Sequence, residues 1–331
     1  MTNVLKVNRW NPEPEIIARA AAILRDGGLV AFPTETVYGL GADGLNARAA
    51  GRIFAAKGRP PDNPLILHLS GPDDAARLAE IDARAGSVME AFWPGPLTLV
   101  LPALPVVPKE VTAGLDTVAL RMPDHPVALA LIEAAGRPVA GPSANRSGRP
   151  SPTDADAVAA DLGSRVDLVL DAGSVEIGLE STVIDLTERE PLLLRPGGMP
   201  RERLERFLGE PLRVPGGAGR DAERRSPGTR HRHYAPAVPV LVWDGGELPP
   251  DADPRSSGFV GMAPPPAKFA WTLLFGSAEN YARGIFAAFR SLEAREGCRH
   301  IVAEWPRPEG LGLALRDRIL RASGNSEGGT G

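Results

Sequence analysis

Short apolar strand patterns alternate with amphipathic helix patterns along the first two hundred residues of the chain. Residues 15–26 place apolar side chains on one helical face and end at Gly27, and the apolar run at 29–32 follows as a buried strand. Asn46 can cap a second helix, which ends at Gly58. Several connections are too short for a helical crossover, so the alternation predicts an α/β (α+β-like) fold built on a twisted, mostly open mixed sheet.

The same periodicities predict the remaining elements of this first domain, which we place at residues 1–210. Further strands are expected at 64–69, 97–101, 117–122, 138–141, 166–170, 182–186 and 192–195. Further helices are expected at 84–93, 126–135, 154–162 and 200–208.

The character of the sequence changes between residues 211 and 236. Glycines are followed there by several arginines with no helical or strand period, so we expect a flexible basic linker. Beyond it, a smaller C-terminal α/β domain is expected over residues 237–331. Its strands are predicted at 238–243, 271–275 and 300–304, and its helices at 280–296 and 313–320.

Composition limits the classes of protein to which this chain can belong. With 43% hydrophobic and 24% charged residues, it is typical of a soluble globular protein, and no apolar run approaches the length of a membrane span. Cys298 is the only cysteine, which excludes disulfides within the chain and cysteine-rich zinc sites and fits a reducing cytoplasm. The net charge of −4 gives no general attraction to nucleic acid, so any polyanion site must be local.

Polar residues cluster where predicted elements end. The strand at 29–32 leads into the hydroxyl-rich turn at 33–41, Pro-Thr-Glu-Thr-Val-Tyr-Gly-Leu-Gly. Open α/β sheets bind their ligands at the carboxyl ends of strands, so this turn is a candidate site. Cations, hydroxyls and an amide at such ends predict a site for an anionic ligand. The other residues of this kind are Lys57, Arg59, Ser143, Asn145, Glu180, Ser181 and Arg195.

Two further polar side chains lie inside predicted strands. Arg121 shares a strand face with Thr117, and a buried arginine needs an anionic partner, either an internal carboxylate or the carboxylate of a substrate. His68 alternates with apolar residues, a pattern shared by hydrogen-bonded core histidines and by ligand contacts. His231 and His233 lack a third ligand nearby, so no metal site on protein side chains is predicted.

Two common nucleotide-binding motifs are excluded. Gly39, Gly41 and Gly44 match the spacing of a dinucleotide fingerprint, but residues 34–38 separate them from the strand. The acidic residue expected about twenty positions later would be Asp62, which lies in a proline-rich loop. The sequence also contains no Gly-x-x-x-x-Gly-Lys-Ser/Thr run. A nucleotide must therefore be held in another way.

Taken together, these segments resemble the Sua5/YrdC/YwlC family of L-threonylcarbamoyladenylate synthases. The resemblance covers about residues 10–236, and the extra C-terminal domain is similar to that of the two-domain Sua5 form. It implies a YrdC-like sheet with a large concave cavity lined by positive charge. The motifs that carry it are residues 33–40, 57–60, 63–66, 143–148 and 233–236.

The family resemblance implies a nucleotidyltransferase. L-threonine, bicarbonate or CO2, and ATP with Mg²⁺ would give threonylcarbamoyl-AMP and pyrophosphate, without a tightly bound organic cofactor. The product would feed N6-threonylcarbamoyladenosine formation at position 37 of tRNA, by hand-over to a separate transferase complex. Weak RNA contact through the basic cavity and linker is a further hypothesis, and no membrane partner is expected.

The resemblance also assigns residues to roles. Catalysis is expected of Lys57, Arg59, Ser143 and Asn145. Threonine contacts are expected of Thr36, His68, Arg121, Gly141 and Ser181. ATP contacts are expected of Arg59, Asn63, Thr117, Ser143, Ser151, Arg195, His233 and Tyr234. Arg121 is chosen for the threonine carboxylate, because its fork can hold both oxygens and its burial otherwise lacks a partner.

The linker resembles a lid in two-domain members, with His233 and Tyr234 at its end. Thr229 and His231 stand where the family more often has methionine and tyrosine. An RNA-binding module is the second hypothesis, but aromatic residues make up only 5% of the chain, and no aromatic platform for base stacking is found near the basic residues. A relative that uses carbamoyl phosphate would carry zinc-finger-like cysteines and an acylphosphatase segment, and neither is present.

Overall fold

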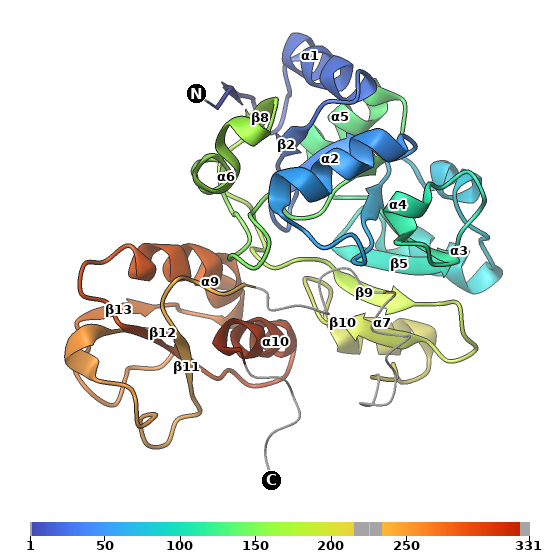
Figure 1. Cartoon of the computed structure of the whole chain (residues 1–331). Helices are drawn as coiled ribbons and strands as arrows, with labels where there is room; N and C mark the ends of the chain where they lie inside the picture. Colours follow the sequence, from blue (N-terminus) through green and yellow to red (C-terminus); the bar gives the residue numbers. More distant parts are fainter. Residues whose placement is uncertain (1, 215–224, 226–233, 325–331) are drawn as a thin grey trace.

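Two β-sheets organise the computed structural model, which describes residues 2–214, 225 and 234–324 (Figure 1). The first is a ten-stranded mixed sheet, and the second is a four-stranded sheet formed by the C-terminal part of the chain. This architecture confirms the predicted fold class. None of the helices in the described ranges is both long and apolar enough to cross a membrane.

The large sheet has the spatial order β1-β8-β2-β3-β7-β4-β6-β5-β9-β10. The sheet contains both parallel pairs, such as β4 with β6, and antiparallel pairs, such as β2 with β3, as the short connections predict. The strands are β1 (Val4–Lys6), β2 (Val30–Phe32), β3 (Gly39–Asp43), β4 (Ile66–His68), β5 (Leu97–Pro102), β6 (Thr117–Arg121), β7 (Val139–Ala140), β8 (Leu168–Asp171), β9 (Thr182–Asp185) and β10 (Leu192–Arg195).

Helices cover both faces of this sheet, because the side chains of each strand alternate between two cores. Val30 and Phe32 of β2 pack with α1 and α5, which lie side by side in Figure 1, whereas Ala31 packs in the core that holds α2 and α3. The helices are α1 (Pro14–Arg25), α2 (Ala47–Lys57), α3 (Ala83–Phe92), α4 (Lys109–Thr112), α5 (Pro126–Ala135), α6 (Ala155–Leu162) and α7 (Arg201–Leu208), with short 3₁₀ turns at Pro72–Arg77 and Gly163–Arg165.

Strand β3 corrects the sequence interpretation, which placed residues 39–41 in a turn. Gly39 and Gly41 lie in a fully buried strand beside the Phe32 ring. A Cβ atom at Gly41 would lie 2.9 Å from both Phe32 Cε1 and Val139 Cγ1. The glycines therefore permit close packing inside a strand. The predictions also missed β1, which has only three residues, and β12 (Ser257–Gly261) in the second sheet.

The second sheet is parallel throughout, in the order β11-β14-β12-β13. Two helices pack on it, and in Figure 1 they are the parts of this domain nearest to the first domain. Arg290 of α9 reaches across to Asp161 with an ion pair of 2.8 Å. The elements not yet given are β11 (Val240–Trp243), β13 (Trp271–Leu274), α9 (Ala278–Glu293), β14 (His300–Glu304), α10 (Gly312–Ser323) and a 3₁₀ turn at Pro254–Ser256.

Replacement of Gly41 by alanine tests the packing of β3 on β2. The new Cβ would overlap with Phe32 and Val139, so we expect Gly41→Ala to lower the free energy of unfolding by about 1–3 kcal/mol. Gly51→Ala is the matched control, because Gly51 lies on α2 with no atom within 4 Å of its Cβ position. This variant should gain about 0.5–1 kcal/mol from helix propensity. Urea denaturation of both variants measures the difference, and equal stabilities would contradict the close packing.

Candidate functional site

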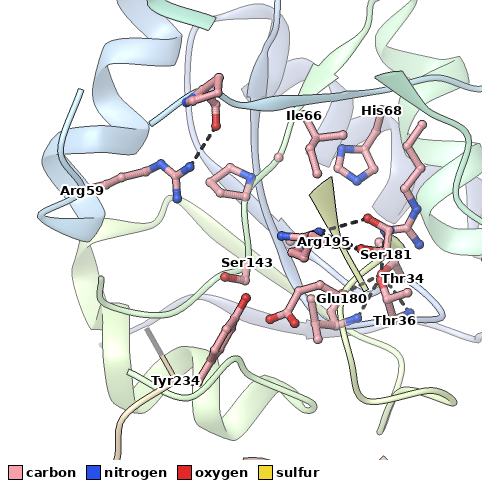
Figure 2. A pocket seen from close by; sticks show the side chains of 16 residues that line it. Thr34, Thr36, Arg59, Ile66, His68, Ser143, Glu180, Ser181, Arg195 and Tyr234 are labelled. Carbon is pink, nitrogen blue, oxygen red and sulfur yellow. Dashed lines mark hydrogen bonds between the residues drawn. The ribbon is translucent and has the colours of Figure 1, made fainter. Parts of the chain in front are cut away.

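A pocket lies in the first domain, with an empty space of about 580 Å³ that includes its mouth (Figure 2). Its walls come from the loops after β2, α2 and β7, the loop before β9, strands β3, β4, β6 and β10, and Tyr234. The lining residues are Thr34, Thr36, Val37, Gly39, Arg59, Pro64, Ile66, His68, Arg121, Gly141, Pro142, Ser143, Glu180, Ser181, Arg195 and Tyr234.

The predicted site residues divide between this pocket and the layer behind it. All of the residues expected at threonine line the pocket, and so do Arg59, Ser143, Arg195 and Tyr234 from the ATP set. The residues that were expected at the ligand but do not line it are Lys57, Asn63, Thr117, Asn145 and Ser151. His233 lies outside the described residues.

The turn after β2 is held by its own hydroxyl groups. Thr34 Oγ1 lies 2.7 Å from Thr36 Oγ1, donates to the main-chain oxygen of Val37 at 2.7 Å, and accepts from the main-chain nitrogen of Val37 at 3.2 Å. Because these bonds fix both threonines, the pocket presents hydroxyl groups in set positions.

Arg121 has an internal ionic partner, which corrects the premise that its burial lacks one. Its Nη2 lies 2.6 Å from Glu35 Oε1, and both side chains are only 4% exposed. Nη1 donates to Thr36 Oγ1 at 3.0 Å, and Nε donates to the main-chain oxygen of Gly95 at 3.2 Å. A guanidinium carries five N–H donors, so the anchored group retains hydrogens for a ligand in the pocket.

His68 faces the pocket beside Gly141 as a neutral imidazole. Burial, reinforced by the Arg121 guanidinium, lowers the pKa of His68 to about 3. Its Nδ1 is buried and has no hydrogen-bond partner among the described residues. A Cβ atom at Gly141 would lie 3.0 Å from this nitrogen, so the glycine leaves its surroundings open. A buried polar atom of this kind can accept a hydrogen bond from a ligand.

Lys57 lies beneath the loop after β7 and does not point at the pocket as expected. Its Nζ donates to the main-chain oxygens of Ser143 and Asn145, each at 2.5 Å. Asn145 is also internal to this loop, because its Nδ2 donates to the main-chain oxygens of Arg146 and Arg149. Ser143, whose hydroxyl donates to Asn145 Oδ1, is the residue of the group that reaches the pocket.

Two buried arginines give the pocket its positive charge. Arg59 is 8% exposed and donates to the main-chain oxygens of Asn63 and Pro64. Arg195 is 4% exposed and donates to the main-chain oxygen of Ser181. Burial, reinforced by the nearby Arg195 guanidinium, lowers the pKa of Arg59 to about 10. An anion in the pocket would offset this desolvation and repulsion.

Glu180 is a lining residue to which the sequence interpretation gave no role. Its Oε1 accepts from Ser151 Oγ at 2.5 Å, and its Oε2 accepts from Arg318 Nε at 2.7 Å. Burial raises the pKa of a carboxyl, but Arg318 and Arg195 hold the pKa of Glu180 below its usual value. The sequence indicated that Glu180 stands at a strand end. It gave no sign of the partner Arg318, which lies 138 positions further along the chain.

The fold and pocket together define a two-domain protein of the Sua5 type. The crystal structure of Pyrococcus abyssi Sua5 complexed with L-threonine is similar with a TM-score of 0.89, at 44% identity and with 98% of each chain covered. The family model described as telomere recombination matches residues 22–197, and the model of the threonylcarbamoyl-AMP synthase C-terminal domain matches residues 199–324. The chain belongs to the Sua5/YciO/YrdC family.

Relatives of full length carry the name threonylcarbamoyl-AMP synthase. The one from Pyrococcus abyssi is 46% identical over 340 residues, with 98% of both chains covered. The one from Bacillus subtilis is 40% identical over 356 residues, with 97% of this chain and 99% of the relative covered. Escherichia coli YciO is similar in structure to the first part of the chain, with a TM-score of 0.56 at 28% identity over 60% of this chain.

The lowered pKa of His68 predicts how stability depends on pH. Between about pH 6.5 and 3 the unfolded chain binds a proton at this residue and the folded chain does not, so stability falls as the pH falls. The loss is up to about 1.4 kcal/mol per pH unit. His68→Asn should flatten the decline, as measured by urea denaturation between pH 7 and 5. His125, whose pKa burial lowers to about 4, remains in both proteins and is the internal control. Identical slopes would show that His68 titrates normally.

Proposed function

We propose that this protein is an L-threonylcarbamoyl-AMP synthase. It combines L-threonine, bicarbonate or CO2, and ATP to give threonylcarbamoyl-AMP and pyrophosphate. The observation that supports this most directly is that one pocket contains two chemically different regions side by side. Arg59 and Arg195 supply buried positive charge for phosphates, and beside them the hydroxyls and imidazole around Arg121 suit a small polar amino acid.

Threonine is assigned to the part of the pocket formed by Thr36, His68, Arg121, Gly141 and Ser181. Arg121 binds its carboxylate, and the Glu35 ion pair keeps the guanidinium in place. The neutral His68 Nδ1 accepts a hydrogen bond from the ligand's amino or hydroxyl group. Ser181 is aligned by Thr98, whose hydroxyl lies 2.7 Å from its own.

ATP is assigned to the arginine-lined part of the pocket. Arg59, Arg195, Ser143 and Tyr234 contact the nucleotide, and His233 is assigned to it from the sequence alone. Magnesium enters bound to the triphosphate. In the parts of the chain that the structure describes, no group of three or more His, Cys, Asp or Glu side chains could hold a metal ion.

The remaining predicted residues form a supporting layer in this proposal. Lys57 and Asn145 fix the loop that carries Ser143, and they act on the reaction through that loop. Ser151 holds Glu180 from behind the pocket wall. Asn63 and Thr117 are buried beside the pocket, and nucleotide contact by either would require a local movement.

The reaction joins two anions, so the protein's main task is to neutralise charge and align the reactants. The neutral amine of threonine forms a C–N bond with CO2 and loses a proton, which gives a carbamate. A carbamate oxygen then attacks the α-phosphorus of ATP, the bond to the β-phosphate oxygen breaks, and pyrophosphate leaves with its electron pair. Arg59 and Arg195 stabilise the charge that accumulates on the phosphates.

We assign these steps to a catalytic domain at residues 1–210 and a C-terminal domain at 237–331. The lid that the sequence predicts at residues 211–236 falls largely outside the described residues, because 215–224 and 226–233 are not among them. The carbamate and the mixed anhydride both react with water, so their exclusion from solvent favours the product. Threonylcarbamoyl-AMP then passes to a transferase complex that modifies tRNA. The buried, free Cys298 is compatible with a cytoplasmic location.

Omission of single substrates tests the proposed reaction. Pyrophosphate release from ATP should require both threonine and bicarbonate, and threonylcarbamoyl-AMP should appear in equal amount by mass spectrometry. Arg59→Met should reduce the rate by about a hundredfold or more, because it removes a charge aimed at the phosphates. Arg48→Met is the control, since Arg48 lies exposed on α2, the helix that ends two residues before Arg59. Pyrophosphate release that ignores threonine would refute the function.

Separate Michaelis constants test the place of threonine. Arg121→Met should raise the KM for threonine about tenfold or more and change the KM for ATP little, because it removes a charged hydrogen bond to one substrate. Arg137→Met is the matched control, since Arg137 also pairs with a buried carboxylate, Asp43 at 2.9 Å, but does not line the pocket. An equal rise in both constants would place the threonine carboxylate elsewhere.

A further inference from the structure

We propose that Arg318, on α10 of the second domain, is a positioning residue that holds Glu180 and Tyr234 in the wall of the pocket. The proposal rests on the proposed function, because it concerns how that site is completed. In this proposal, the C-terminal domain helps to shape the catalytic pocket through the buried side chain of Arg318.

The contacts of Arg318 lead to the first domain. Its side chain is 0% exposed, and Nε donates to Glu180 Oε2 at 2.7 Å. Nη1 donates to the main-chain oxygen of Pro196 at 3.1 Å and also pairs with Asp317. Pro196 directly follows Arg195, a lining residue. Arg318 therefore contacts two segments of the pocket wall, the one that carries Glu180 and the one that carries Arg195.

Tyr234 is the second lining residue that Arg318 contacts. The guanidinium carbon lies 5.0 Å from the centroid of the Tyr234 ring, in a cation–π arrangement. The same ring stacks on Phe286 of α9, with centroids 5.3 Å apart. Tyr234 has φ +64°, a left-handed conformation that a residue other than glycine adopts at a cost. Side chains of the second domain therefore hold this backbone in place, and Tyr234 lines the pocket beside Glu180 and Ser143 (Figure 2).

Contact between the two domains does not by itself require a fully buried arginine such as Arg318. Burial of a charged side chain is costly, and good geometry with an opposite charge must offset the cost. Arg283 of α9 crosses the same interface and donates to the main-chain oxygen of Glu176, which does not line the pocket. Arg318, by contrast, neutralises a carboxylate in the wall of an anion site. Without Arg318, Glu180 would keep Arg195 as a nearby cation, but the carboxylate charge that is no longer offset would repel the phosphates of ATP.

Kinetics of matched variants test the proposal. Arg318→Met should lower kcat about tenfold or more and leave the KM for threonine nearly unchanged, because Arg318 contacts Glu180, Tyr234 and Pro196 and none of the residues assigned to threonine. Arg318→Lys keeps the charge and should restore much of the loss. Arg283→Met should match the wild-type protein in kcat, and thermal melting of each variant reports on folding. Wild-type kcat in Arg318→Met, or equal losses in Arg318→Met and Arg318→Lys, would overturn the proposal.

A spectroscopic readout separates this inference from the proposed function. The chain has 3 tyrosines, so fluorotyrosine labelling gives few ¹⁹F signals, and Tyr234→Phe identifies the one from Tyr234. Arg318→Met should move that signal, whereas Arg283→Met should leave it in place; an unmoved signal would overturn the proposal. If Arg318→Met does not fold, the ¹⁹F signal of Tyr234 is compared instead between the wild-type protein, Arg318→Lys and the double variant Arg318→Met with Glu180→Gln. If the wild-type protein forms no threonylcarbamoyl-AMP, the proposed function fails and the ¹⁹F shift still decides the role of Arg318.

Discussion

The ammonium group of Lys57 ties the end of α2 to the loop after β7, and the geometry of the pocket depends on this contact. A buried ammonium must be surrounded by oxygen atoms, and here the main-chain oxygens of Ser143 and Asn145 provide them. Gly58, at φ +62°, then reverses the chain so that Arg59 enters the pocket from the same helix end. One buried side chain, Lys57, thereby sets the positions of two lining residues, the cation Arg59 and the hydroxyl of Ser143.

The pocket has two regions that differ in charge. Around Arg121 the charge is almost balanced, because Glu35 pairs with the guanidinium and His68 is neutral. Such surroundings suit an amino acid that brings both an anionic and a basic group. Around Arg59 and Arg195 the positive charge is in excess, and Glu180 does not cancel it because Arg318 neutralises that carboxylate. The second domain therefore contributes to the charge balance of the first.

Local patterns predicted most of the elements, and the exceptions have physical reasons. The apolar run of β2 and the capped helix α2 were recognisable because their signals lie within a few residues. Strand β3 was missed because Gly39 and Gly41 read as a turn, whereas they are required by the ring of Phe32. The candidate residues around Arg121 line one pocket, but the sequence interpretation overlooked Glu35 as the partner of Arg121, although it stands in the same motif as Thr34 and Thr36.

The sequence alone determined the family, the alternation of strands and helices, and the residue types that meet at the pocket, because these follow from local periodicity and from short motifs. Tertiary structure decided which of these side chains line the pocket. The side chains of Lys57 and Asn145 donate hydrogen bonds to main-chain oxygens behind the pocket. Arg318, from a helix near the C-terminal end of the chain, donates to Glu180 in the pocket wall. Contacts over such separations depend on how the two domains pack and leave no periodic trace in the sequence.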